Sequence, residues 1–134
     1  MSFREKSAWI NLAAIVLVYG FYAYGIWGAP PTRLGAIAVL IGSTIGMIVI
    51  SIAGHIAIAI GQRPEVVDER DMLVGLRSAR NGFHALAAGV WTLIFLAIAL
   101  PGPPILLAYA ALSVFVLAEV VRLISALVYY RTAA

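Results

Sequence analysis

The fold is decided by an uncharged stretch near the start of the chain, Trp9–Trp27, which reads WINLAAIVLVYGFYAYGIW. As a helix, these nineteen residues would be about 28 Å long, which matches a hydrocarbon core of about 30 Å. Arg4 and Lys6 precede the stretch as they would in a signal peptide. The apolar run is nevertheless long enough to span, and no small-residue cleavage site follows it. The stretch is therefore predicted to be a retained transmembrane helix.

Three further apolar stretches follow, at residues 34–60, 83–100 and 105–130. The chain is 63% hydrophobic and only 11% charged, which is outside the range of soluble domains and makes lipid the expected solvent. Short turns rich in glycine and proline join spans one and two and spans three and four, so each pair must be antiparallel. We therefore expect an all-α integral membrane four-helix bundle that forms a single domain over residues 1–134.

The count of lysine and arginine on the two sides predicts the orientation, because short cytoplasmic flanks carry the excess. One side carries only Arg33. The other side carries seven basic residues, namely Arg4, Lys6, Arg63, Arg70, Arg77, Arg80 and Arg131. The sequence thus predicts a multi-pass protein of the cell inner membrane with both termini in the cytoplasm. A net charge of +3 is explained by these flanks and does not predict direct binding of nucleic acid.

The cytoplasmic loop, residues 61–82, carries eight of the chain's fifteen charges. Acidic residues come first and arginines last, which is the order that a helix dipole favours, so residues 64–81 are predicted to form a surface helix that leads into span three. Three interpretations of the acidic cluster remain: a solvated helix start, a divalent cation site, and a surface for a soluble partner. The candidate partner-binding residues are Asp68, Glu69, Arg70, Asp71, Arg77 and Arg80.

The sequence Asp68-Glu69-Arg70-Asp71, together with AEVVRLI at 118–124 and Tyr129-Tyr130-Arg131, resembles a family of small predicted bacterial membrane proteins of unknown function. The resemblance covers about the second half of the chain. It implies a membrane partner or antagonist of a small helix-turn-helix transcription regulator. It implies no catalytic residues.

Four polar residues are expected inside the membrane on its cytoplasmic side: His55, His84, Glu119 and Arg122. A charge in the middle of a span is costly, so such groups should face other helices and pair. Glu119 and Arg122 are three residues apart and share a helix face. We expect the four to form one polar cluster, which could serve as a structural network, a proton relay or ligand site, or a haem or metal site through the histidines.

Small residues at regular spacing predict close helix packing in two spans. Gly42 and Gly46 form this pattern in span two, and Ala85 and Gly89 form it in span three. The contact could lie within one chain or between the subunits of a homodimer.

Among the functions considered, a regulatory or interaction role explains the charge distribution best. The alternatives are a small proton-coupled transporter that uses Glu119, and a haem- or metal-binding membrane protein that uses His55 and His84. The chain has no cysteine, which excludes disulfide, thiolate and iron–sulfur chemistry. We also find no motif of a hydrolase or a phosphate-binding loop, so no enzyme activity and no cofactor are expected.

Overall fold

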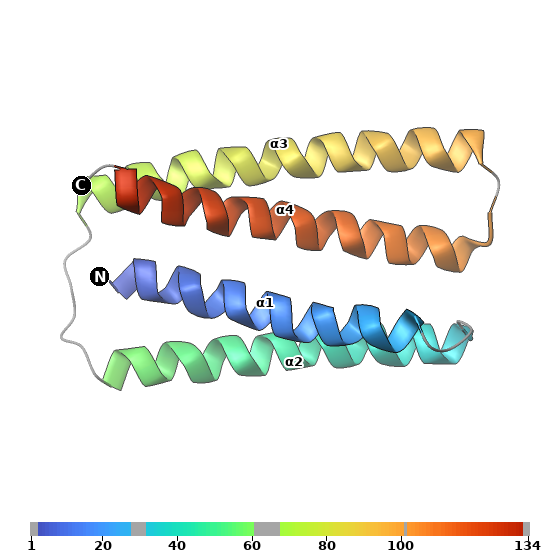
Figure 1. Ribbon diagram of the computed structural model, residues 1–134, viewed down its shortest axis with the longest axis horizontal. Coiled ribbons are helices and arrows are strands. Elements are labelled where there is room, and N and C mark those ends of the chain that lie inside the picture. Colours follow the sequence, from blue (N-terminus) through green and yellow to red (C-terminus); the bar gives the residue numbers. More distant parts are fainter. Residues whose placement is uncertain (1–2, 28–31, 61–67, 101, 133–134) are drawn as a thin grey trace.

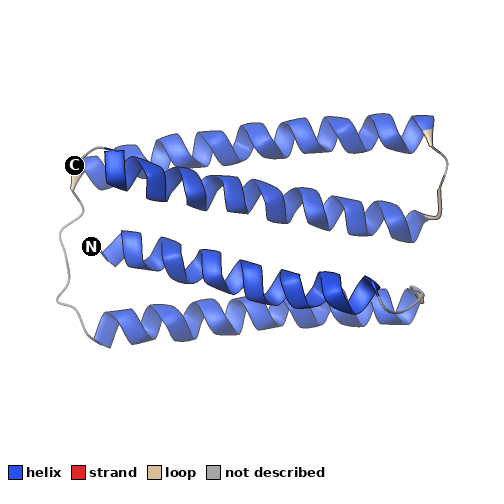
Figure 2. Ribbon diagram, viewed as in Figure 1, coloured by secondary structure: helices blue, strands red, loops and turns tan. Residues whose placement is uncertain are grey.

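The computed structural model describes residues 3–27, 32–60, 68–100 and 102–132, and it shows an all-α protein (Figures 1 and 2). Within these residues there are four helices, α1 (Phe3–Trp27), α2 (Arg33–Ile60), α3 (Glu69–Ala99) and α4 (Pro104–Thr132). Each helix is long and apolar enough to cross a membrane. The helices alternate in direction, and both described ends of the chain lie at the same end of the molecule (Figure 1).

Local sequence explains where two of the helices begin. Thr32 caps α2, because its hydroxyl accepts a hydrogen bond of 3.1 Å from the backbone N–H of Gly35. Pro104 is the first residue of α4, a position where a proline's missing N–H costs nothing.

Helix α3 begins at Glu69, fourteen residues before the start expected for span three at Phe83. Asp68 occupies its N-cap position, and Glu69 and Asp71 lie in its first turn, where the helix dipole stabilises acidic side chains. The helix predicted over residues 64–81 and leading into span three is therefore the first part of α3 from Glu69 on, and residues 61–67 lie outside the described part. A helix of 31 residues is about 46 Å long, so α3 must extend beyond a hydrocarbon core of about 30 Å.

The helices form an open row in the order α2, α1, α4 and α3 (Figure 1). Helix α3 packs most extensively on α4, and α1 packs on both α2 and α4. The remaining helix pairs make at most marginal contact. Because α2 and α3 each pack extensively on one neighbour only, large side chains such as Ile41, Trp91 and Ile98 are exposed where lipid would cover them.

The α1–α4 contact is an apolar seam. Ala8 and Ile15 of α1 are buried against Leu123 and Leu127 of α4. Ala8 and Ile15 are seven residues apart, and Leu123 and Leu127 are four apart. Both spacings keep side chains on one face of a helix. This seam joins the α1–α2 hairpin to the α3–α4 hairpin.

The α3–α4 contact depends on glycine. A Cβ atom at Gly82 would lie 2.8 Å from Cβ of Arg122 and 3.2 Å from the backbone oxygen of Ala118. A Cβ atom at Gly89, seven residues later on the same face, would clash with the side chain of Val114. The two backbones can approach this closely only because these positions have no side chain.

We predict that Gly89→Leu destabilises the α3–α4 hairpin, because the new side chain would meet Val114 in a packed contact. The expected loss is about 1–3 kcal/mol of unfolding free energy, measured by SDS titration of the purified protein in mixed micelles. Gly75→Leu is the control on the same helix, since a Cβ there meets nothing within 4 Å. Equal losses in the two variants would contradict the close approach at Gly89.

Candidate functional site

The start of α3 is fastened to the end of α4 by Arg70. Its guanidinium Nη2 donates a hydrogen bond of 2.8 Å to the backbone oxygen of Tyr130. That oxygen lies in the last turn of α4, where carbonyl groups lack partners within the helix and where a positive charge is favourable. The carboxylate of Asp71 lies within electrostatic range of the Tyr130 hydroxyl. Arg70 and Asp71, two of the expected partner-binding residues, therefore take part in contacts within the chain.

Asn81 forms a second link between α3 and α4 that sequence reasoning missed. Its amide nitrogen donates one hydrogen bond to the Ser125 hydroxyl at 3.1 Å and another to the Tyr129 hydroxyl at 3.0 Å. Asn81 is half-buried between the two helices, where its amide has less access to water and gains from such partners. In the sequence, the signal for this link was that the polar residue Asn81 directly precedes Gly82, on a helix face of small residues.

The other two helices are fastened at the same end. The Arg131 guanidinium of α4 lies over the Trp9 ring of α1, 5.8 Å from its centroid. In α2, His55 Nδ1 lies 2.6 Å from the backbone oxygen of Ser51, which can only accept, so Nδ1 carries the proton. His55 Nε2 then accepts a hydrogen bond of 2.6 Å from the Ser7 hydroxyl of α1. His55 therefore links α2 to α1.

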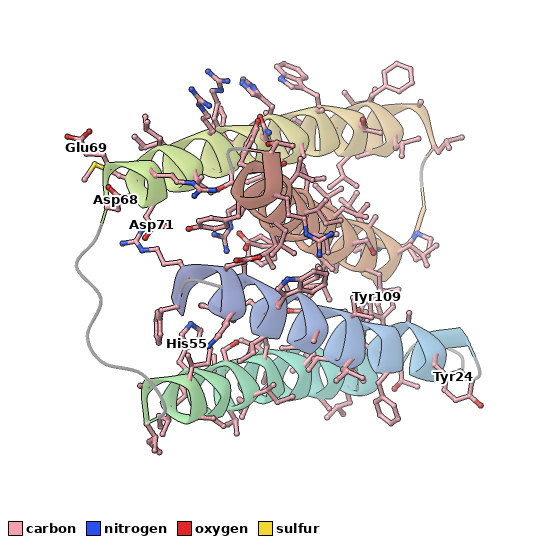
Figure 3. All side chains as sticks on the ribbon, turned by 60° about the vertical axis from the view of Figure 1, so that its left-hand side comes forward. Tyr24, His55, Asp68, Glu69, Asp71 and Tyr109 are labelled. Carbon is pink, nitrogen blue, oxygen red and sulfur yellow. The ribbon has the colours of Figure 1, made fainter. Side chains whose placement is uncertain are left out.

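The acidic start of α3 is open to solvent. Asp68 and Glu69 are exposed, and neither side chain has a hydrogen bond or ion pair with another described residue. Figure 3 shows them at the tip of the helix, with Asp71 on the side nearer to α1. Asp68 and Glu69 line a shallow pocket of about 460 Å³ together with Arg70, Arg77 and Tyr129. Arg77 and Arg80 are also exposed, about two and three turns farther along α3.

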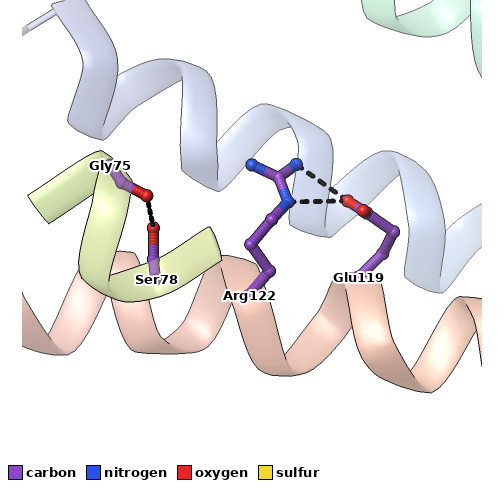
Figure 4. Close-up of polar contacts among 4 residues, drawn as sticks. All are labelled: Gly75, Ser78, Glu119 and Arg122. Atoms are coloured by element: carbon purple, nitrogen blue, oxygen red, sulfur yellow. Dashed lines mark hydrogen bonds and ion pairs between the residues drawn. The ribbon is translucent and has the colours of Figure 1, made fainter. Parts of the chain in front are cut away.

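Glu119 and Arg122 pair with each other on α4 (Figure 4). Glu119 Oε2 accepts hydrogen bonds from Arg122 Nε at 2.9 Å and from Nη2 at 2.7 Å. The figure also shows buried Ser78 of α3, whose hydroxyl donates to the Gly75 backbone oxygen at 3.0 Å. Neither Glu119 nor Arg122 has a further polar partner in the described part of the chain.

The structure does not bring His55 and His84 to the Glu119–Arg122 pair. His84 is exposed and its described contact is with the Phe83 ring, 6.1 Å away between centroids. The reason is helix phase: Gly82 faces α4, and a residue two positions later points about 200° away. His55 lies on α2, which α1 separates from α4 (Figure 1). Among the described residues, no group of three or more His, Asp or Glu side chains is placed to hold a metal ion.

The small residues of α2 and α3 have different surroundings. Gly89 lies in the α3–α4 contact, and Ala85 is half-buried on the same helix. A Cβ at Gly42 or Gly46 would meet nothing within 4 Å. These two glycines of α2 therefore make no close helix contact within the described chain.

No protein-family model, curated protein or solved structure matches this chain. The resemblance carried by residues 68–71 and by the end of α4 stays a prediction. The site is therefore interpreted from its own geometry.

We predict that Asn81→Ala loosens the α3–α4 hairpin, because it removes two interhelical hydrogen bonds. The expected loss is about 1–2 kcal/mol of unfolding free energy in an SDS titration. Thr92→Ala is the matched control on α3, since the Thr92 hydroxyl bonds only to the backbone oxygen of Ala88 in its own helix. An Asn81→Ala variant as stable as the control would show that these bonds contribute nothing.

Proposed function

We propose that this chain is a regulatory or interaction protein of the inner membrane that docks a soluble cytoplasmic partner on the start of α3. One observation carries the proposal. Asp68 and Glu69 are exposed and unpaired among the described residues, while their neighbour Arg70 is fastened to α4. The two carboxylates thus lie on a helix end that is hydrogen-bonded to α4, and they remain free to accept hydrogen bonds from another molecule.

The orientation of the chain supports a cytoplasmic partner. The end of the molecule that carries the start of α3 also carries both described ends of the chain (Figure 1). By sequence, this end has seven lysine and arginine residues and the opposite end has one. Such an excess is typical of the cytoplasmic side.

The chemistry of the surface indicates what the partner must offer. Two carboxylates without partners call for a basic group, and Arg77 nearby calls for an acidic one. A mixed pattern of this kind favours selection of one partner over others more than it raises affinity. A small helix-turn-helix regulator, the class that the family resemblance implies, presents basic side chains and is our candidate.

A proton-coupled transporter built on Glu119 has less support. A proton relay requires a chain of polar groups that reaches water on both sides of the membrane. Glu119 is engaged by Arg122, and no further polar contact extends from the pair among the described residues. The pair fits a structural role, in which each charge compensates the other within the apolar span.

The docking surface can be tested by site-specific photo-crosslinking in intact cells. A photo-reactive residue at Met72, which is exposed one turn after Asp68, should capture a soluble protein, and Asp68→Lys in the same chain should reduce that adduct at least about fivefold. Trp91, an exposed residue on the same helix, is the matched control position and should give no soluble adduct. A Met72 adduct that is unaffected by Asp68→Lys would contradict the proposed role of the carboxylates.

The orientation has its own test. A reporter that is active only in the cytoplasm should be active when fused after Ala134, and inactive when inserted after Gly102 between α3 and α4. The opposite pattern would place Asp68 and Glu69 outside the cytoplasm and would exclude a cytoplasmic partner.

A further inference from the structure

The face of α3 that points away from α4 carries polar and apolar side chains in one line. Gly82 marks the opposite face, because a Cβ atom there would meet α4. Arg80, His84 and Trp91 are two residues before, two after and nine after Gly82. At about 100° per residue, each of them points within about 20° of the direction opposite to Gly82. All three are exposed, and α3 packs extensively on α4 alone, so this outer face is turned away from the bundle.

Arg80 and His84 supply hydrogen-bond donors on the outer face. Neither side chain has a hydrogen bond or an ion pair with another described residue. On α3, the acidic residue nearest to Arg80 is Asp71, nine residues earlier and about 14 Å away along the helix axis. Arg77, which is also exposed, adds a second cation one turn before Arg80. This part of α3 therefore calls for an anionic ligand.

The depth of these donors indicates that the ligand is an amphiphile. The apolar stretch of α3 begins at Phe83, so Arg80 lies about 4.5 Å outside it and His84 lies at its start. Trp91 and Ile98 continue the outer face into the apolar stretch and are 72% and 80% exposed. In a bilayer, headgroups lie just outside the hydrocarbon core and acyl chains lie inside it. The outer face of α3 has the same order of charged and apolar groups.

Other anions match only one part of this face. A free phosphate ion or an acidic soluble protein could pair with Arg80. Neither would cover Trp91, which lies eight residues beyond Phe83 and about 12 Å inside the apolar stretch. A phospholipid with an anionic headgroup supplies a partner for both parts.

We propose that the outer face of α3 binds an anionic phospholipid, with the lipid phosphate on Arg80 and His84 and an acyl chain along Trp91. The lipid belongs to the leaflet at the end of the bundle that carries both described chain ends. The site uses neither Asp68 nor Glu69, so it goes beyond the docking surface and can fail independently of it.

The probe is phosphatidylglycerol, titrated into the full-length protein in non-ionic detergent micelles, with bound lipid counted by native mass spectrometry. Arg80→Gln should raise the Kd of the first bound lipid about fivefold, the effect of one basic residue on an anionic lipid. His84→Phe keeps a ring, removes the donor and should also raise Kd. Arg33→Gln is the control, since it removes an exposed arginine at the opposite end of the bundle (Figure 1) and should leave Kd unchanged. Equal Kd values for Arg80→Gln and wild type, or for phosphatidylglycerol and phosphatidylcholine, would overturn the proposal.

A second measurement locates the acyl chains. With Trp9→Phe and Trp27→Phe, Trp91 is the only tryptophan of the chain, and bromine atoms on lipid chains quench its fluorescence on contact. In phosphatidylcholine vesicles, brominated phosphatidylglycerol should quench Trp91 more than brominated phosphatidylcholine does at the same mole fraction. Arg80→Gln should remove that difference. Equal quenching by the two lipids before Arg80 is changed would overturn the proposal.

Glycerol phosphate separates a lipid site from a site for phosphate alone. It has the phosphate and the glycerol of the lipid and no acyl chains, so an excess should not reverse the quenching of Trp91. Reversal would show a phosphate site only and would overturn recognition of the lipid.

Discussion

The close approach of α3 to α4 is the contact on which the arrangement of the polar end depends. In lipid, helices gain little from burying apolar surface, so association relies on close packing and on interhelical hydrogen bonds. Gly82 and Gly89 permit that packing, because any side chain at either position would meet α4. With the backbones this close, Asn81 can reach Ser125 and Tyr129, and Arg70 can reach the last turn of α4. The exposed carboxylates of Asp68 and Glu69 are then placed by a helix that is fastened at two points.

Helix α1 joins the α1–α2 hairpin to the α3–α4 hairpin. It packs on α4 through Ala8 and Ile15 and on α2 through its other face, where Ile10 contacts Gly54. Helix α2 gains little burial from this arrangement, since among its described residues only Ala36 and Ser43 are buried. An open row of helices therefore leaves one side of α2 to lipid, and the imperfect fit between α2 and α1 produces a cavity beside Tyr22.

The sequence predicted four helices long and apolar enough to span the membrane, because uncharged runs of this length have few alternatives. The apolar run placed the start of span three at Phe83, and the order of acidic and basic residues predicted a helix over 64–81 that leads into it; α3 is these two parts as one helix from Glu69 on. The sequence also did not show which face of each helix points toward its neighbour. His84 and Gly82 are two residues apart, and only knowledge of which one faces α4 shows that His84 points away from Glu119. For the same reason, Gly42 and Gly46 have the spacing of a packing seam, while the close contacts lie at Gly54, Gly82 and Gly89.

The polar contacts between helices are unevenly distributed along the bundle. In the described part of the chain, the interhelical hydrogen bonds all lie in the half that carries both ends of the chain, and they involve Ser7, Arg70 and Asn81. The opposite half is held by apolar packing and by the tyrosine contact of α1 with α4. Apolar contacts between α1 and α2 can be exchanged for contacts with lipid at little cost, whereas a hydrogen bond broken in lipid leaves both partners unsatisfied. The molecule should therefore be firmest where it presents the carboxylates of α3 and less firmly held in the opposite half.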